Sequence, residues 1–123
     1  NVLNSETIPR LRAKVVAGAA NNQLASDDDG HRLTDRGILY APDYVINAGG
    51  VISVAHEYLG NSTEERVRSE VCRIPERLRR IFADAERSAR PTNVVADELA
   101  RRIVEQGGKT DHENQPTADR RIA

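Results

Sequence analysis

The apolar residues of this chain fall into two patterns that together predict an α/β fold. Two short apolar runs are each followed by asparagine and small residues, which is typical of buried strands in a parallel sheet. The first run covers residues 14–18, and the second is an extended region made of 38–40 and 44–46 with Pro42 between them. Elsewhere apolar residues are spaced three and four positions apart, which predicts helices.

Three short helices are expected around these strands. The first covers residues 5–13, and the second is about one turn at the end of the polar segment 26–36, which Gly37 stops. The third runs over 48–58 and ends before Gly60. The resulting order of helices and strands is that of a parallel sheet covered by helices.

Two longer helices are expected in the second half of the chain. Ser62-Thr63-Glu64-Glu65 is a capping-box pattern that opens one long helix, and Pro75 should bend that helix because proline removes a helical hydrogen bond. A last helix begins at Thr92 as its cap and ends at Gly107-Gly108. With 48–58 they form a predicted bundle of three helices after the sheet. The long helix carries one apolar stripe, made of Val67, Val71, Ile74, Leu78, Ile81 and Ala85.

We expect a single domain over residues 1–106 and a flexible tail over 107–123, because the tail is polar and aperiodic. Two strands are too few for a self-sufficient sheet. The chain also opens on Asn1 and contains no methionine, which favours a fragment or a processed product. We therefore expect a missing half, an exchanged copy or another partner, and a homo-oligomer.

Asparagine follows each predicted strand, and these positions are candidates for ligand binding. Ligands of parallel α/β sheets bind outside the carboxyl ends of the strands, where Asn21, Asn22 and Asn47 are predicted to lie. Gly49-Gly50 would let another molecule approach the backbone closely. The alternative is that the asparagines only cap helices or form turns.

The chain resembles the Glu/Leu/Phe/Val dehydrogenases over residues 3–106, and the resemblance is greatest to the leucine, valine and phenylalanine branch. Thr7-Ile8-Pro9, residues 16–24 and residues 37–50 carry it by their order and spacing. The resemblance implies a partial Rossmann-like parallel sheet, namely the carboxyl-terminal half of an NAD-binding domain. It also implies NAD-dependent oxidative deamination of an apolar L-amino acid such as leucine, valine or phenylalanine to the 2-oxo acid and ammonia.

The resemblance also implies roles for four residues at the cofactor. In the family, the loop matching Ala19, Ala20 and Asn21 packs on the nicotinamide end of the cofactor, and its asparagine reaches the substrate. Asn47 is implied to lie beside the same site. Small residues suit this role because hydride transfer needs the ring held at close range, and an amide offers both a donor and an acceptor.

Val51 and Val54 are implied to line the pocket for the substrate side chain. They lie three residues apart on one predicted helix and so share a face. Members specific for glutamate have a serine at the position of Val54, and burying a carboxylate against valine costs several kcal/mol. An apolar amino acid is therefore favoured as substrate. The alternative is that both valines belong to the hydrophobic core.

Two features expected of the family do not occur in this sequence. It contains no G-x-G-x-x-G turn, and Lys14 and Lys109 do not stand in the context of the catalytic lysines. We assign no catalytic residue and expect the isolated chain to be inactive, with an amino-terminal part of the enzyme as its partner. The alternatives are a non-catalytic, truncated α/β interaction or dimerisation module, and the nucleotide-binding fold of another dehydrogenase group, which the motif at 41–50 disfavours. The choice between NAD and NADP stays open.

Charge and composition exclude several other functions. The net charge of −1 favours neither nucleic acid nor an anionic membrane as partner, and no run approaches the ~20 apolar residues of a membrane span. Cys72 is alone and the three histidines lack the spacing of metal ligands, so we predict no metal site and a reducing, cytoplasmic compartment. The run Asp27-Asp28-Asp29 is interpreted as a solvated loop rather than a cation site.

Overall fold

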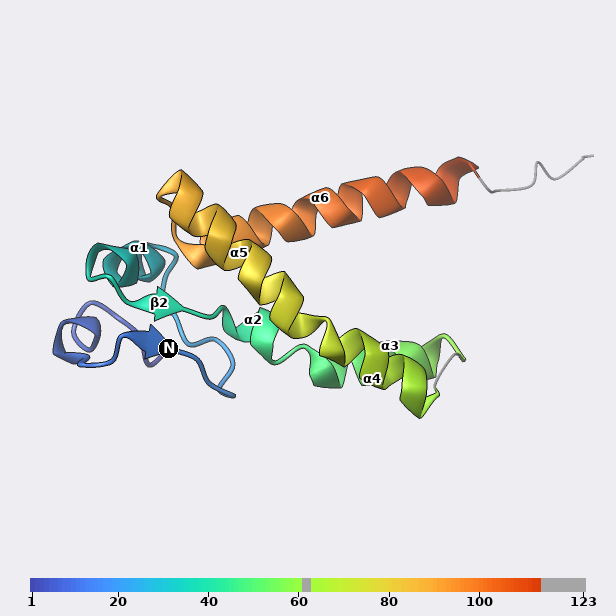
Figure 1. The fold of residues 1–123 in the computed structure, drawn as a ribbon, viewed down its shortest axis with the longest axis horizontal. Helices are drawn as coiled ribbons and strands as arrows, with labels where there is room; N and C mark the ends of the chain where they lie inside the picture. The colour runs from blue at the N-terminus through green and yellow to red at the C-terminus, as the bar shows by residue number, and fades with distance from the viewer. Residues whose placement is uncertain (61–62, 114–123) are drawn as a thin grey trace, which may run out of the picture.

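A small parallel sheet with helices packed around it forms one end of the molecule (Figure 1), in a computed structural model that describes residues 1–60 and 63–113. The predicted α/β class is confirmed. In chain order the elements are the 3-10 helix η1 (Ile8–Arg10), β1 (Val15–Val16), α1 (Asp28–Asp35), β2 (Leu39–Tyr40), α2 (Asp43–Ile46), α3 (Gly49–Tyr58), α4 (Glu64–Cys72), α5 (Ile74–Ser88) and α6 (Thr92–Glu113).

The two strands pair in parallel, and α1 makes the crossover between them. Val15 lies opposite Leu39 and Val16 opposite Tyr40. The amides of Leu39 and Ala41 donate to carbonyls of the β1 segment at 2.9 Å. Because parallel strands end at the same edge of a sheet, the loop after β1 and the segment after β2 begin side by side.

The outer edge of β2 is closed by the start of α6. The hydroxyl of Thr92, predicted to cap the last helix, donates instead to the carbonyl of Tyr40 at 2.7 Å. Thr92 and Tyr40 are both buried. The free edge of the sheet, where a third strand could pair, is therefore at β1. Val15 of this strand is 55% exposed.

The prediction that residues 44–46 continue the second strand is wrong, because the chain turns into the helix α2 after Pro42. Pro42 has φ −55°, has no amide hydrogen for a sheet ladder, and precedes the first residue of this helix. Asn47 consequently follows a short helix, and its amide donates to the carbonyl of Asp43 at 2.9 Å. The apolar run Tyr44-Val45-Ile46 suits either a strand or a helix, and after Pro42 it forms a helix.

The predicted long helix is two helices, α4 and α5, which meet at Arg73. Pro75 stands in the first turn of α5, where a missing amide hydrogen is tolerated, so the chain breaks rather than bends. Thr63 caps α4 by accepting from the amide of Arg66 at 3.3 Å, and Ser62 lies outside the described residues. Together with α2, this break makes five described helices after β2 instead of the predicted three.

Other boundaries differ from the predictions by a few residues. The first helix is only η1, whereas α1 has eight residues instead of about one turn. Gly37 (φ +64°) and Gly60 (φ +67°) follow α1 and α3 in the left-handed conformation, as expected of helix stops. Helix α6 continues through Gly107-Gly108, and residues 114–123 lie outside the described part.

The described residues contain two hydrophobic clusters. The first packs η1 and α1 against the sheet, and the second packs α5 against α6, which cross near the sheet and diverge from it (Figure 1). The pair α3 and α4 extends away from the sheet at the opposite end of α5. The predicted stripe of α4 and α5 is buried or half-buried throughout. The buried members of the clusters are Leu3, Ile8, Leu33, Ile38 and Tyr40 in the first, and Ile81, Ala85, Val95 and Ala96 in the second.

Candidate functional site

The loop after β1 and the segment after α2 meet, as predicted from their asparagines. The side-chain amide of Asn47 donates to the carbonyl of Gly18 at 3.2 Å and to Oδ1 of Asn21 at 3.4 Å. Asn21 and Asn22 are exposed and Asn47 is half-buried. Two amide side chains from segments 26 residues apart therefore lie in contact at the carboxyl edge of the sheet.

A buried glutamine, which sequence reasoning did not single out, holds the inside of this loop. Gln23 is 6% exposed, and its Nε2 donates to the carbonyls of Gly18 at 3.1 Å and Ala20 at 2.9 Å. The loop thus folds around its own glutamine, which leaves Ala19 and Ala20 exposed on the surface. In the sequence, the only sign that Gln23 is buried is its position directly before Leu24. Leu24 packs against the first hydrophobic cluster.

A buried carboxylate, also missed from the sequence, ties the loop to β2 and α2. Asp43 is 7% exposed, its Oδ1 accepts from the hydroxyl of Tyr40 at 2.8 Å, and its Oδ2 accepts from the backbone amide of Asn22 at 2.5 Å. Burial, and then the bond to Asp43, raise the pKa of Tyr40, so the phenol stays protonated and donates. Asn22 itself has φ +53°, a left-handed conformation that is uncommon outside glycine.

Asp43 and the three asparagines border an open cavity of about 950 Å³ between the loop after β1, α2 and α3. One wall is polar and the other is the exposed face of α3, where Val51 is 73% and Val54 is 65% exposed. Both valines therefore lie outside the hydrophobic core of the described residues. Ala19 and Ala20 are on the same loop but do not border the cavity. Its lining is Asn21, Asn22, Asp43, Tyr44, Asn47, Ala48, Gly50, Val51, Val54, Ala55 and Tyr58.

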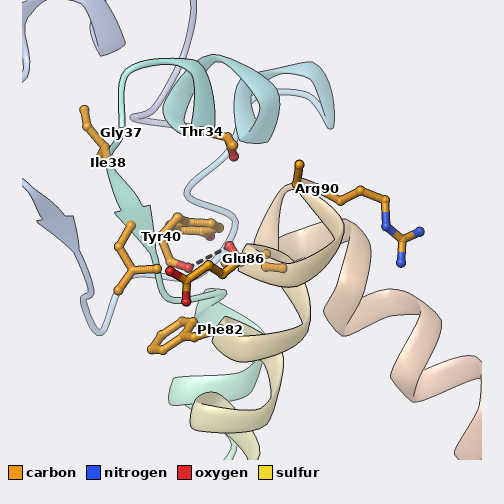
Figure 2. A pocket seen from close by; sticks show the side chains of 11 residues that line it. Thr34, Gly37, Ile38, Tyr40, Phe82, Glu86 and Arg90 are labelled. Atoms are coloured by element: carbon orange, nitrogen blue, oxygen red, sulfur yellow. Dashed lines mark hydrogen bonds between the residues drawn. The ribbon is translucent and has the colours of Figure 1, made fainter.

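A second cavity of about 550 Å³ lies between β2, α1 and α5. Figure 2 shows Phe82 and Glu86 of α5 near the ring of Tyr40, while the side chain of Arg90 points away. The guanidinium of Arg90 instead binds both carboxylate oxygens of Glu98, at 2.5 and 2.9 Å, and these bonds lower the pKa of Glu98. The polar side chains around this cavity do not converge on a common point, so it carries no candidate chemistry.

The acidic run 27–29 is not the solvated loop that we predicted, because Asp29 is buried at the start of α1. Asp29 is 2% exposed and accepts from the amide and the hydroxyl of Ser26, both at 2.9 Å, and from Arg32 at 2.7 Å. The spacing from Ser26 to Asp29 is that of a capping box, a signal visible in the sequence. Burial alone would raise the pKa of Asp29, but the bonds from Ser26 and Arg32 outweigh it and lower this pKa.

Metal and membrane sites find no support in the described part of the chain. Over 1–60 and 63–113, no three histidine, cysteine, aspartate or glutamate side chains gather where they could hold a metal ion. Within the same residues, no helix has the length and apolar character needed to cross a membrane.

Comparisons with known proteins point to one family. Residues 1–105 match the family model of glutamate/leucine/phenylalanine/valine dehydrogenases. The chain is 48% identical to a leucine dehydrogenase of Thermoactinomyces intermedius over 109 residues, which are 89% of this chain and 30% of that enzyme. It is 51% identical to a valine dehydrogenase of Streptomyces albus over 98 residues, or 80% of this chain and 27% of that enzyme.

A solved structure agrees with these sequence matches. The crystal structure of an L-tryptophan dehydrogenase from Nostoc punctiforme superposes with a TM-score of 0.78 and 44% identity, covering 85% of this chain and 31% of that protein. The chain thus spans less than a third of the length of these three proteins.

Proposed function

The chain belongs to the glutamate/leucine/phenylalanine/valine dehydrogenase family, and we propose that it forms the carboxyl-terminal part of the Rossmann-like cofactor domain of an NAD-dependent amino acid dehydrogenase. The proposed reaction is the oxidative deamination of an apolar L-amino acid to its 2-oxo acid and ammonia. The observation that carries this proposal is the cavity in which Asn21 and Asn47 face the apolar wall of α3.

The amide pair suits the nicotinamide end of the cofactor and the polar end of the substrate. Within the described residues, Nδ2 of Asn21 and Oδ1 of Asn47 make no hydrogen bond, so one donor and one acceptor remain for ligands. Ala19 and Ala20 are exposed and have no side chain beyond Cβ, so a flat ring can approach their backbone. When bound, the nicotinamide would accept a hydride from the substrate; these residues would orient ring and substrate.

The wall of α3 favours an apolar substrate side chain. Val51 and Val54 are exposed on the cavity side of α3 and offer methyl groups, with no charged group between them. A substrate carboxylate placed there would lose water without gaining a partner, which costs several kcal/mol. We therefore propose leucine, valine or phenylalanine rather than glutamate.

The proposed partner is the remainder of the enzyme, with a homo-oligomer as the finished assembly. The chain covers about 30% of its relatives, and the free edge of β1 at Val15 offers unpaired backbone groups for a further strand. Thr92 closes the other edge, so we place the missing strands beside β1. The reducing, cytoplasmic compartment stays a prediction from the lone Cys72.

A hybrid enzyme tests this proposal. In this hybrid, residues 1–106 of the chain replace the matching segment of the Thermoactinomyces intermedius leucine dehydrogenase. We expect NADH formation with leucine, valine or phenylalanine and much less with glutamate. Asn47→Ala should lower kcat/KM by about ten- to a hundredfold, because the orientation of the reactants is lost.

The matched control is Gln106→Ala, which removes an exposed amide from α6, a helix that does not border the cavity. Equal losses in the Asn47→Ala and Gln106→Ala hybrids would mean that the site lies elsewhere. A preference for glutamate would overturn the apolar substrate. The isolated chain should form no NADH, because it lacks the phosphate-binding turn and the catalytic lysine segment.

A non-catalytic interaction module is the second candidate function. It is favoured by apolar side chains near the middle of α6, where Ile103 is 59% and Val104 is 73% exposed. An inactive hybrid that still assembles like the parent enzyme would support this reading over the first.

A further inference from the structure

Asp43 connects three segments that form the candidate site. It is the first residue of α2, it bonds the last residue of β2 through Tyr40, and it bonds the loop after β1 through Asn22. A buried carboxylate is stable only when its oxygens are hydrogen-bonded, and both oxygens of Asp43 have a partner. Through these hydrogen bonds, the position of each of the three segments depends on that of the other two.

The bond to Asn22 decides the shape of the loop. Asparagine tolerates φ +53° better than most residues other than glycine, and a contact made only in this conformation favours it further. The amide of Asn22 donates to Oδ2 of Asp43 at 2.5 Å in this conformation. Since Asn21 immediately precedes this turn, the direction of its side chain depends on the same bond.

Tyr40 holds the carboxylate in place from the other side. Its ring is buried beside α5 (Figure 2), its backbone is bonded to Thr92, and its hydroxyl reaches Oδ1 of Asp43 at 2.8 Å. A line of contacts therefore runs from the buried start of α6 through Tyr40 and Asp43 to the exposed loop.

We propose that Asp43 is a positioning residue, which holds the turn at Asn22 so that the amide of Asn21 stays beside that of Asn47. This inference rests on the proposed function, because it assigns the turn to the site for cofactor and substrate. Asp43 acts through hydrogen bonds of its carboxylate, and its charge takes no part in the reaction. Catalysis tolerates displacements of only about half an ångström in such groups.

The test compares Asp43→Ala with Asp43→Asn in the hybrid enzyme. Asp43→Ala removes both bonds, and we expect faster hydrogen exchange at the amide of Asn22 and a kcat/KM for leucine lowered by about ten- to a hundredfold. Asp43→Asn keeps an acceptor for Asn22 and places a donor toward the oxygen of Tyr40. It should therefore retain kcat/KM within a few fold and keep slow exchange.

Asp29→Ala is the matched control, because it removes a similarly buried carboxylate whose partners Ser26 and Arg32 do not border the cavity. It should leave exchange at Asn22 and kcat/KM unchanged below the unfolding temperature. If Asp43→Ala fails to fold, Tyr40→Phe removes only the donor to Asp43. It should then raise exchange at Asn22 by a smaller factor.

The outcomes separate this inference from the proposed function. Unchanged exchange at Asn22 in Asp43→Ala overturns the positioning role whatever the activity. Faster exchange with unchanged kcat/KM also overturns it, and so does an Asp43→Asn enzyme as slow as Asp43→Ala. The proposed function fails separately, if the unmodified hybrid is inactive or if Asn21→Ala has no effect.

Discussion

Two buried aspartates lie in the first turns of successive helices, but the two regions around them are built differently. In the α1 region, Asp29 bonds only Ser26 and Arg32, each three residues away. Both partners lie within α1 or at most two residues before it. This region is a local capping arrangement, which the helix can form from its own sequence.

In the site region, the carboxylate of Asp43 reaches across the fold. One of its partners, Asn22, is 21 residues away in the chain, and the other, Tyr40, is held by the sheet and by α6. A buried aspartate can therefore stabilise a single helix, as Asp29 does, or connect several segments of the fold, as Asp43 does. Only the second kind depends on the whole fold being in place.

The largest effect on stability is expected from Asp43→Ala. The change leaves the buried hydroxyl of Tyr40 and the amide of Asn22 without their acceptor, and hydrogen bonds to a charged group contribute about 1.5–3 kcal/mol each. We expect a loss of about 3 kcal/mol in urea unfolding. In a double-mutant cycle with Tyr40→Phe the two losses should not add, and strict additivity would show that the bond between them contributes nothing.

The next largest effect on stability is expected from Gly30→Ala, because Gly30 is where α1 packs against a distant segment, the start of α6. A Cβ at Gly30 would lie 2.8 Å from Cγ and 3.0 Å from Nδ2 of Asn93, whose side chain is buried at the start of α6. Such overpacking costs about 1–3 kcal/mol. The control is Gly50→Ala, where a Cβ meets no atom within 4 Å. Equal unfolding free energies for both variants would contradict the tight contact.

Asp29→Ala should cost less, about 1 kcal/mol, because it removes a local cap. The loss should depend on pH. The pKa of Asp29 is lower in the folded protein, so its contribution is complete above its unfolded pKa of about 4 and disappears as the pH falls through the folded value. Urea unfolding of wild type and variant from pH 7 to pH 3 checks this. A difference that grew toward low pH would contradict the sign.

Val54→Ser should change stability least, because 65% of the Val54 side chain is exposed. We expect unfolding to shift by less than about 0.5 kcal/mol. In the hybrid enzyme, kcat/KM for leucine should fall by roughly tenfold as apolar contact is lost, and the gain for glutamate should be smaller. An unchanged leucine value would place the side-chain pocket on another face. A loss of stability without a change in substrate preference would show that Val54 belongs to the hydrophobic core.

Local patterns in the sequence predicted those parts of the fold that one element can determine alone. The stripe that includes Ile74, Ile81 and Ala85 is buried as its spacing indicated, and Gly37 and Gly60 end their helices. The parallel pairing was also predictable, and so was the contact of Asn21 with Asn47, although Asn47 follows the short helix α2 rather than the strand itself. The role of Asp29 was visible too, in a capping-box spacing that we interpreted as a solvated loop.

The tertiary structure decided the rest, for reasons that spacing along the chain does not contain. A run such as Tyr44-Val45-Ile46 suits a strand or a helix, and its packing against α5, after Pro42, selected the helix. The tie from Asp43 to Asn22 depends on which segments the parallel sheet brings together. By itself, the sequence determined the family, the fold class and the edge at which we propose the site. Only the folded chain decided that Asp43 holds the turn at Asn22, because a contact between residues 21 positions apart exists only after the sheet has formed.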